Sequence, residues 1–161
     1  MLSPIPATPK LQPSLAQRSR VAIITAQFNA KYSASLERHC VAALQQAGLA
    51  RDRIATFAVP GALEIPVVAK RLAEQKEFSV MVAFGVVLKG ETYHFEIVAD
   101  QCAAGLQQVA VQTGIPVINE VLACYTAAQA EARCGDNDSN KGREAAAAAV
   151  AMLNLLARLP G

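Results

Sequence analysis

The chain has 161 residues and a formal net charge of +2, with 53% hydrophobic and 17% charged residues. This length suits one domain with a sizeable core, and the scattered basic residues form no stripe that would indicate a nucleic-acid partner. The longest apolar run, residues 145–153, is far too short to span a membrane.

The N-terminal segment carries prolines at positions 4, 6, 9 and 13 and has no apolar stretch typical of a signal peptide. We therefore expect an extended N-terminal arm over residues 1–19, followed by a single α/β domain over residues 20–161. None of the four cysteines forms a C-x-x-C pair, and the two histidines add no zinc-ligand spacing. We expect buried free thiols in a cytoplasmic protein that holds no metal.

The first half of the domain alternates strand and helix. Residues 21–26 form a short apolar run that favours a buried strand. Residues 33–47 place apolar side chains on one helical face, and Gly48 ends this helix. A second strand is predicted over residues 54–59. A Pro-Gly turn then leads into a helix over residues 63–74, whose early proline lies where a missing N–H costs least.

The second half continues the alternation. Residues 80–87 form the third strand, and a long helix follows over residues 94–112. A fourth strand begins near residue 115 and runs to about residue 122. Two helices close the chain, over about residues 126–133 and 141–159.

Strands that are too apolar to face water on either side, and that alternate with helices, indicate a parallel sheet covered on both faces. We predict a flavodoxin-like three-layer α/β sandwich with a four-stranded parallel sheet of order 2-1-3-4. Ligands of such sheets bind at the carboxyl ends of the strands. The segments that follow the predicted strands are residues 27–29, 60–62, 88–94 and 119–125.

The segment around the end of the third strand has glycines at the spacing of a nucleotide-binding loop. Gly85, Gly90 and Thr92 match the spacing of a nucleotide-binding P-loop. Glu91, however, occupies the position of the lysine that should reach the phosphates, and a carboxylate there would repel them. A nucleotide P-loop is therefore disfavoured, although a turn before a helix N-terminus still suits a smaller phosphate.

Five blocks in this chain resemble lumazine synthases (6,7-dimethyl-8-ribityllumazine synthases) in order and spacing. The combination of V-P-G-A-x-E-I-P with a downstream G-x-T-x-H is specific to that family. The blocks cover residues 26–29, 59–66, 85–95, 114–118 and 130–142.

The resemblance implies a cofactor-free condensation, the penultimate step of riboflavin biosynthesis. A ribitylaminouracil amine attacks the ketone of 3,4-dihydroxy-2-butanone 4-phosphate, phosphate is eliminated, and the ring closes with loss of water. His94 would be the general acid and base, because an unperturbed imidazole titrates near neutral pH. Arg133 would be the catalytic countercharge of the phosphate, and the family's pentamers place this arginine at the site of the neighbouring subunit.

The resemblance also implies the residues that bind the substrates. Phe28 would stack on the pyrimidine, although a core position is an equally ordinary role for a phenylalanine. Asn119 would face the same ring. The remaining contacts would be Gly61, Ala62, Leu63 and Glu64 along the ribityl chain; backbone groups of Val86, Val87 and Leu88 at the uracil edge; and Glu91, Thr92 and Lys141 at the phosphate, with Glu144 one turn further on.

Asn119 departs from the family pattern, which usually has an aromatic residue there. The substitution removes an apolar wall of the pyrimidine pocket and is followed by Glu120. It leaves open an alternative function, a catalytically weak flavin-binding or lumazine-binding protein, or a shell-forming paralogue.

Family members assemble as homo-oligomeric pentamers, and some form shells of 60 subunits. The short segment of residues 133–141 favours such a shell, which can hold riboflavin synthase as a partner. The high apolar fraction agrees with large subunit interfaces. We expect small-molecule substrates, and neither a nucleic-acid partner nor a membrane.

Overall fold

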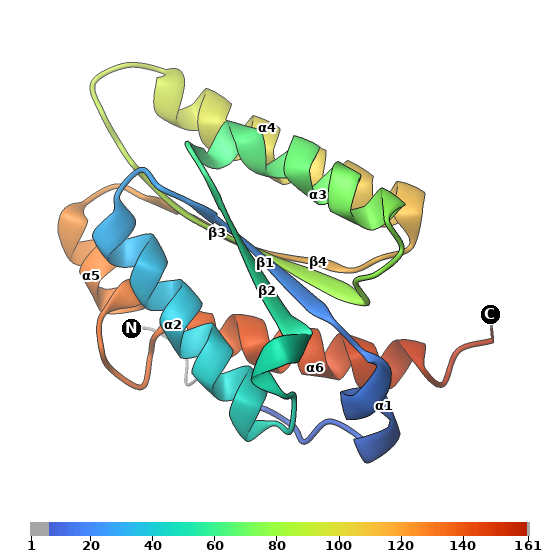
Figure 1. Ribbon diagram of the computed structural model, residues 1–161. Coiled ribbons are helices and arrows are strands. Elements are labelled where there is room, and N and C mark those ends of the chain that lie inside the picture. The colour runs from blue at the N-terminus through green and yellow to red at the C-terminus, as the bar shows by residue number, and fades with distance from the viewer. Residues whose placement is uncertain (1–6, 161) are drawn as a thin grey trace.

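The computed structural model describes residues 7–160, and the expectations for residues 1–6 and 161 lie outside the described residues (Figure 1). One parallel sheet has the order β2-β1-β3-β4, which confirms the predicted topology. Its strands are β1 (Val21–Ala26), β2 (Ile54–Val59), β3 (Val80–Leu88) and β4 (Val117–Cys124).

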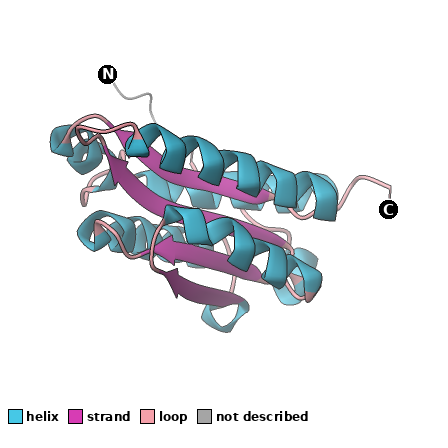
Figure 2. Cartoon of the chain, turned by 90° about the horizontal axis from the view of Figure 1, so that it is seen from above, coloured by secondary structure: helices cyan, strands magenta, loops and turns pink. Residues whose placement is uncertain are grey.

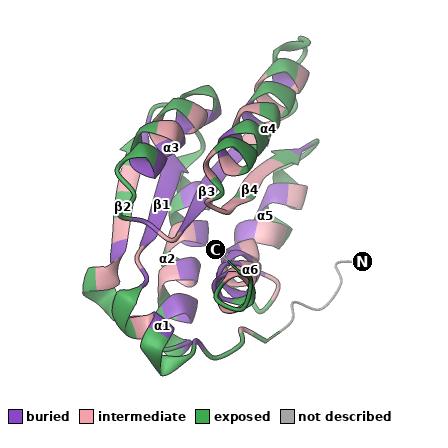
Figure 3. Ribbon diagram, turned by 90° about the vertical axis from the view of Figure 1, so that its right-hand side faces the viewer, coloured by how far each residue is buried: buried purple, intermediate pink, exposed green. Residues whose placement is uncertain are grey.

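Helices cover both faces of the sheet, as predicted (Figures 1 and 3). On one face lie α3 (Ile65–Glu74), which follows the short turn η2 (Ala62–Glu64), and α4 (His94–Thr113). On the other lie α2 (Ala30–Gln46), α5 (Ala127–Cys134) and α6 (Lys141–Leu156). Each face encloses its own apolar cluster, so burial of both faces holds the three layers together.

The position of each strand explains its burial. Every residue of β1 is buried, as are the first seven residues of β3, because these two strands are central. The edge strands β2 and β4 are only partly buried, and η1 (Arg51–Arg53) leads into β2. Figure 2 shows the helices running alongside the strands of the sheet.

The N-terminal arm differs from the prediction of an extended segment over residues 1–19. Within it, α1 (Pro13–Arg18) is helical. Leu11 and Leu15 are buried in the core beneath α2 and α6, and the Leu11 N–H donates to the Ala47 carbonyl at 3.0 Å. Pro13 does not prevent a helix because it lies at the first helical position, where its missing N–H is not needed.

Several predicted boundaries shift. The first long helix begins at Ala30 instead of residue 33, because Asn29 adopts a left-handed conformation (φ 56°) and ends the loop early. The last helix ends at Leu156 instead of residue 159, and β4 continues to Cys124. None of the helices in residues 7–160 combines the length and apolarity that crossing a bilayer requires.

The strands end at different heights, and this stagger positions the site. β1 and β2 end together at the pair Ala26 and Val59. The last pair between β1 and β3 joins Thr25 to Phe84, whereas β3 and β4 stay paired as far as Leu88 and Cys124. The last residues of β3, beyond the end of β1, therefore have one edge that no strand covers.

Candidate functional site

A cavity of about 390 Å³ opens at the carboxyl ends of β1, β2 and β3. It contains most of the substrate-binding residues expected from the sequence, and it also contains the candidate acid and base. The expected residues that line it are Phe28, Gly61, Ala62, Leu63, Glu64, Val86, Val87, Leu88 and His94. Ala26, Asn29 and Val98 complete the lining.

Phe28 forms an exposed aromatic wall of this cavity. Its exposed fraction is 73%, which excludes the alternative that Phe28 is a core residue. Gly61 permits the close approach of its neighbours: an added Cβ would lie 3.0 Å from Glu64 Oε2 and 3.4 Å from Phe28 Cδ2. The glycine thus lets a carboxylate and an aromatic face line one side of the cavity together.

Asn29 is a lining residue that the sequence analysis did not assign. Its Nδ2 donates to the Val86 carbonyl at 2.7 Å, across the gap where β1 no longer covers β3. Backbone groups of alternate residues point to the same side of a strand, so Leu88 presents its groups on the same edge as Val86. This uncovered edge offers backbone donors and acceptors to a planar ligand. The signal for Asn29 in the sequence is a polar residue in the short segment that follows a buried strand.

His94 is the first residue of α4 and is exposed at the rim of the cavity. The loop before it is held in place by Lys89, which pairs with Glu96 and lies 5.1 Å from the centre of the Phe95 ring. Glu91 and Thr92 are exposed in this loop and are not among the cavity-lining residues. They lie beside the free amides at the start of a 20-residue helix, a position that favours an anion.

The structure places the other expected residues away from the cavity of the same chain. Arg133 lies in the last turn of α5, where its Nη1 donates to the Gln129 carbonyl at 3.0 Å. Lys141 pairs with Glu144 in the first turn of α6. Asn119 lies on the edge strand β4, and its Oδ1 accepts from the Val121 N–H at 3.0 Å. Arg133, Lys141 and Glu144 thus form a second group on α5 and α6, on the other face of the sheet.

Asn140 fixes the turn that carries this second group. It is fully buried, and its Oδ1 accepts from the Gly142 N–H at 2.8 Å as the N-cap of α6. Its Nδ2 donates to the carbonyls of Cys134 and Gly135, both at 2.9 Å. One amide thus ties the end of α5 to the start of α6, and so sets the spacing of Arg133 and Lys141.

Glu120 is a second residue whose role the sequence analysis did not assign. It is half-buried on β4, and burial raises its pKa to about 7. The Glu144 carboxylate adds to this rise in pKa, and the Lys141 ammonium opposes it. The signal in the sequence is a carboxylate in the middle of a largely apolar strand.

The four cysteines are unpaired and buried, as expected. Burial raises the pKa of Cys102 to about 11 and that of Cys134 to about 12, and it also raises the pKa of Cys40 and Cys124. The thiols are therefore protonated at neutral pH and poor nucleophiles. Across residues 7–160, His, Cys, Asp and Glu side chains form no group of three or more that could hold a metal ion.

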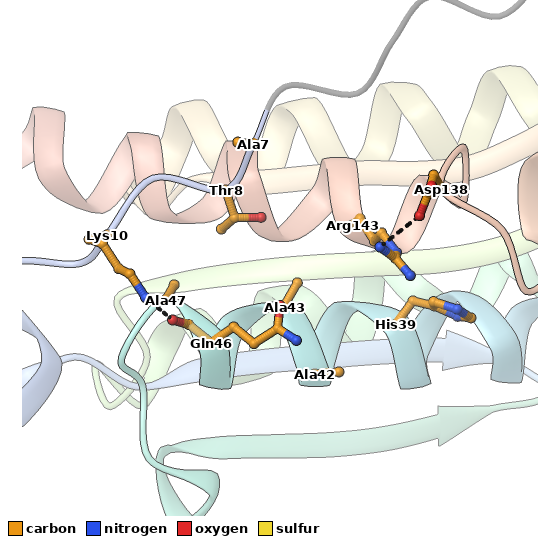
Figure 4. A pocket seen from close by; sticks show the side chains of 10 residues that line it. All are labelled: Ala7, Thr8, Lys10, His39, Ala42, Ala43, Gln46, Ala47, Asp138 and Arg143. Carbon is orange, nitrogen blue, oxygen red and sulfur yellow. Dashed lines mark hydrogen bonds and ion pairs between the residues drawn. The ribbon is translucent and has the colours of Figure 1, made fainter.

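A larger cavity of about 490 Å³ lies between the N-terminal arm, α2 and the start of α6 (Figure 4). Its cations are already engaged: Lys10 Nζ donates to the Gln46 carbonyl at 2.6 Å, and Arg143 lies 3.4 Å from the Asp138 carboxylate. His39 Nδ1 contacts the Ser35 carbonyl at 2.9 Å. No expected substrate-binding residue lines this cavity, which separates it from the site at the strand ends.

Comparison with known proteins gives a consistent result. A family model described as 6,7-dimethyl-8-ribityllumazine synthase matches residues 18–157. A protein of that name from Xanthomonas oryzae pv. oryzae (strain PXO99A) is 44% identical, over 88% of this chain and 92% of the relative. Another of the same name, from Stenotrophomonas maltophilia (strain R551-3), is 43% identical over 89% of this chain and 93% of the relative.

Proposed function

The chain belongs to the 6,7-dimethyl-8-ribityllumazine synthase family, and we propose that the cavity at the ends of β1, β2 and β3 is its active site. The enzyme is a transferase of riboflavin biosynthesis. It condenses 5-amino-6-(D-ribitylamino)uracil with 3,4-dihydroxy-2-butanone 4-phosphate to the lumazine, releasing phosphate and water. The observation that carries the site proposal is the meeting of nine expected residues from three separate segments in one cavity.

The pyrimidine substrate binds between Phe28 and the uncovered edge of β3. The exposed ring supplies a stacking face, worth about 0.5–1.5 kcal/mol beyond its buried area. The backbone groups near Val86 and Leu88 pair with the uracil edge. Glu64 accepts hydrogen bonds from ribityl hydroxyls beside Gly61, which leaves room for the chain.

The phosphate of the second substrate binds at the start of α4. Glu91 and Thr92 contribute backbone amides there, and Thr92 adds its hydroxyl. Arg133 and Lys141 supply the positive charge, because a guanidinium fork matches a phosphate in a bidentate manner. In one chain these cations lie on the other side of the sheet, on α5 and α6. They therefore serve the cavity of a neighbouring subunit.

A homo-oligomer is what the family implies, and the surface supports it. Large apolar side chains of α3 and α4 are exposed in the single chain, including Val67 (61%), Ile97 (44%) and Val111 (73%). We favour pentamers that assemble into a shell of 60 subunits, with riboflavin synthase as a partner, in the cytoplasm. The four buried thiols agree with a reducing compartment.

Light scattering on the purified protein tests the assembly. The mass expected is that of the 60-subunit shell, because the turn between α5 and α6 is short and fixed by Asn140. A particle of only five chains would contradict the shell and leave the pentamer standing.

His94 moves the protons of imine formation and phosphate elimination. His94→Ala is expected to lower kcat by about a hundredfold or less, at the low end for general acid–base catalysis. The loss is modest because holding two reactants together contributes on the order of 7–11 kcal/mol. Steady-state kinetics measure the change. His39→Ala, which removes the other histidine, is the matched control and keeps wild-type turnover. Complete inactivity of His94→Ala, with assembly and substrate binding intact, would contradict this role.

Asn119 supports the second candidate, a flavin-binding or lumazine-binding protein with weak turnover. Its amide Oδ1 is engaged by the Val121 N–H, and the residue offers no aromatic face to the pyrimidine. Flavin that copurifies with a protein lacking turnover would favour this alternative over the synthase.

A further inference from the structure

Glu120 lies where β4 meets α6, within the group that holds the proposed phosphate-binding cations. Ile118, Leu122 and Cys124 contact the core beneath α2, α5 and α6. Side chains at alternate positions of a strand point to the same face, so Glu120 points to this side as well. It thus faces the start of α6, whereas Asn119 faces away.

The groups that face Glu120 come from three helices. Lys141 and Glu144 come from α6, and both act on its charge. Cys134 of α5 and Cys40 of α2 also lie within its electrostatic reach, but burial raises the pKa of both thiols and keeps them neutral. The charged part of this cluster is therefore two carboxylates and one ammonium.

The ammonium already has one partner. Lys141 pairs with Glu144, three residues further along the helix. Within residues 7–160, the Glu120 carboxyl forms no side-chain hydrogen bond to either of them. With Glu120 protonated, the charges of the cluster sum to 0 (+1 for Lys141, −1 for Glu144). With Glu120 ionised they sum to −1.

The change between these two states occurs near neutral pH. Burial raises the pKa of Glu120 to about 7, so the group is largely protonated at pH 6 and largely ionised at pH 8. Ionisation places a second anion beside Lys141, and that anion opposes the approach of a phosphate dianion.

We propose that Glu120 is a positioning residue that controls how available the Lys141 ammonium is to the phosphate of the butanone substrate. The proposal rests on the proposed role of Lys141 in binding that phosphate. When Glu120 is neutral, Glu144 is the only carboxylate that attracts the Lys141 ammonium, and the ammonium can turn toward the phosphate. An ionised Glu120 competes for the ammonium and repels the dianion.

The test is inhibition by sulfate, which stays doubly charged throughout this pH range and so removes the titration of phosphate itself. The wild-type inhibition constant is expected to rise from pH 6 to pH 8 by about threefold to tenfold more than that of Glu120→Gln. The KM for the butanone phosphate should follow the same pattern, and the KM for the pyrimidine should not. Glu131→Gln, an exposed acid on α5, is the control and keeps the wild-type profile.

The outcomes separate the two levels of the argument. Parallel pH profiles of wild type and Glu120→Gln, with normal turnover, overturn the role of Glu120 and leave the synthase intact. An unchanged sulfate inhibition in Lys141→Ala overturns the premise about Lys141. If Glu120→Gln does not assemble, the wild type alone decides, because a sulfate inhibition constant that stays constant from pH 6 to pH 8 also overturns the proposal.

Discussion

Arg133→Ala is expected to lower kcat/KM for the butanone phosphate by about two to three orders of magnitude, the usual cost of removing one partner of a desolvated charge pair. The substrate carries a dianion, and a guanidinium is the group best suited to bind it in a bidentate manner. Arg133 is held by the Gln129 carbonyl in the last turn of α5, so its remaining N–H groups can face a ligand. Among residues 7–160 the Arg133 side chain bonds only to this backbone carbonyl, so its removal leaves no buried side chain there unpaired and stability should change little.

Steady-state kinetics with each substrate varied in turn measure this effect. Arg133→Lys should recover part of the loss, since an ammonium keeps the charge but lacks the fork. Arg143→Ala, which removes a cation that lines the other cavity, is the matched control and retains wild-type values. An unchanged kcat/KM in Arg133→Ala would remove the arginine from the phosphate site.

Gly142→Ala is expected to destabilise the subunit by about 3 kcal/mol or more, because overpacking against backbone cannot be relieved by rotating a side chain. An added Cβ would lie 2.1 Å from the Leu36 carbonyl oxygen, a backbone atom of α2. The start of α6 would have to move away from α2, and the N-cap hydrogen bond from Gly142 to Asn140 would be strained. We expect the melting temperature to fall by about 10 °C or more. Activity should fall as well, because the displaced start of α6 carries Lys141.

Thermal unfolding followed by circular dichroism measures this prediction. Gly90→Ala is the matched control, because among residues 7–160 no heavy atom beyond Gly90 and its two chain neighbours lies within 4 Å of a Cβ built at Gly90. Its melting temperature should stay close to that of the wild type. Equal melting temperatures for the two variants would mean that α2 and α6 do not pack as closely as the structure shows.

Much of the fold was predictable because its signals are local. Continuous apolar strands and alternating helices led to the correct strand order and to the two covered faces. The prolines near the N-terminus favour extended structure, so the sequence does not predict α1. The contacts that bury Leu11 and Leu15 are long-range and leave no local signal in the sequence. The early start of α2 was missed because it depends on the left-handed conformation of Asn29.

The candidate site was predictable in part. Ligands bind at the carboxyl ends of strands, and this rule together with the family motifs predicts that Phe28, Glu64 and His94 lie close together. In the structure all three line one cavity. The separation of Arg133 and Lys141 from that cavity depends on which face each helix covers. The raised pKa of Glu120 could not be predicted from the strand alone, because it arises from burial and from the approach of α6.

The central claim is that this chain catalyses the lumazine-forming condensation, and a steady-state assay tests it most directly. Purified, assembled protein is mixed with 5-amino-6-(D-ribitylamino)uracil and the butanone phosphate, and lumazine absorbance is followed against the uncatalysed background. We predict turnover well above background that falls sharply in Arg133→Ala. Background rates from a correctly assembled wild-type oligomer would contradict the synthase and point to Asn119 and a binding or shell-forming role.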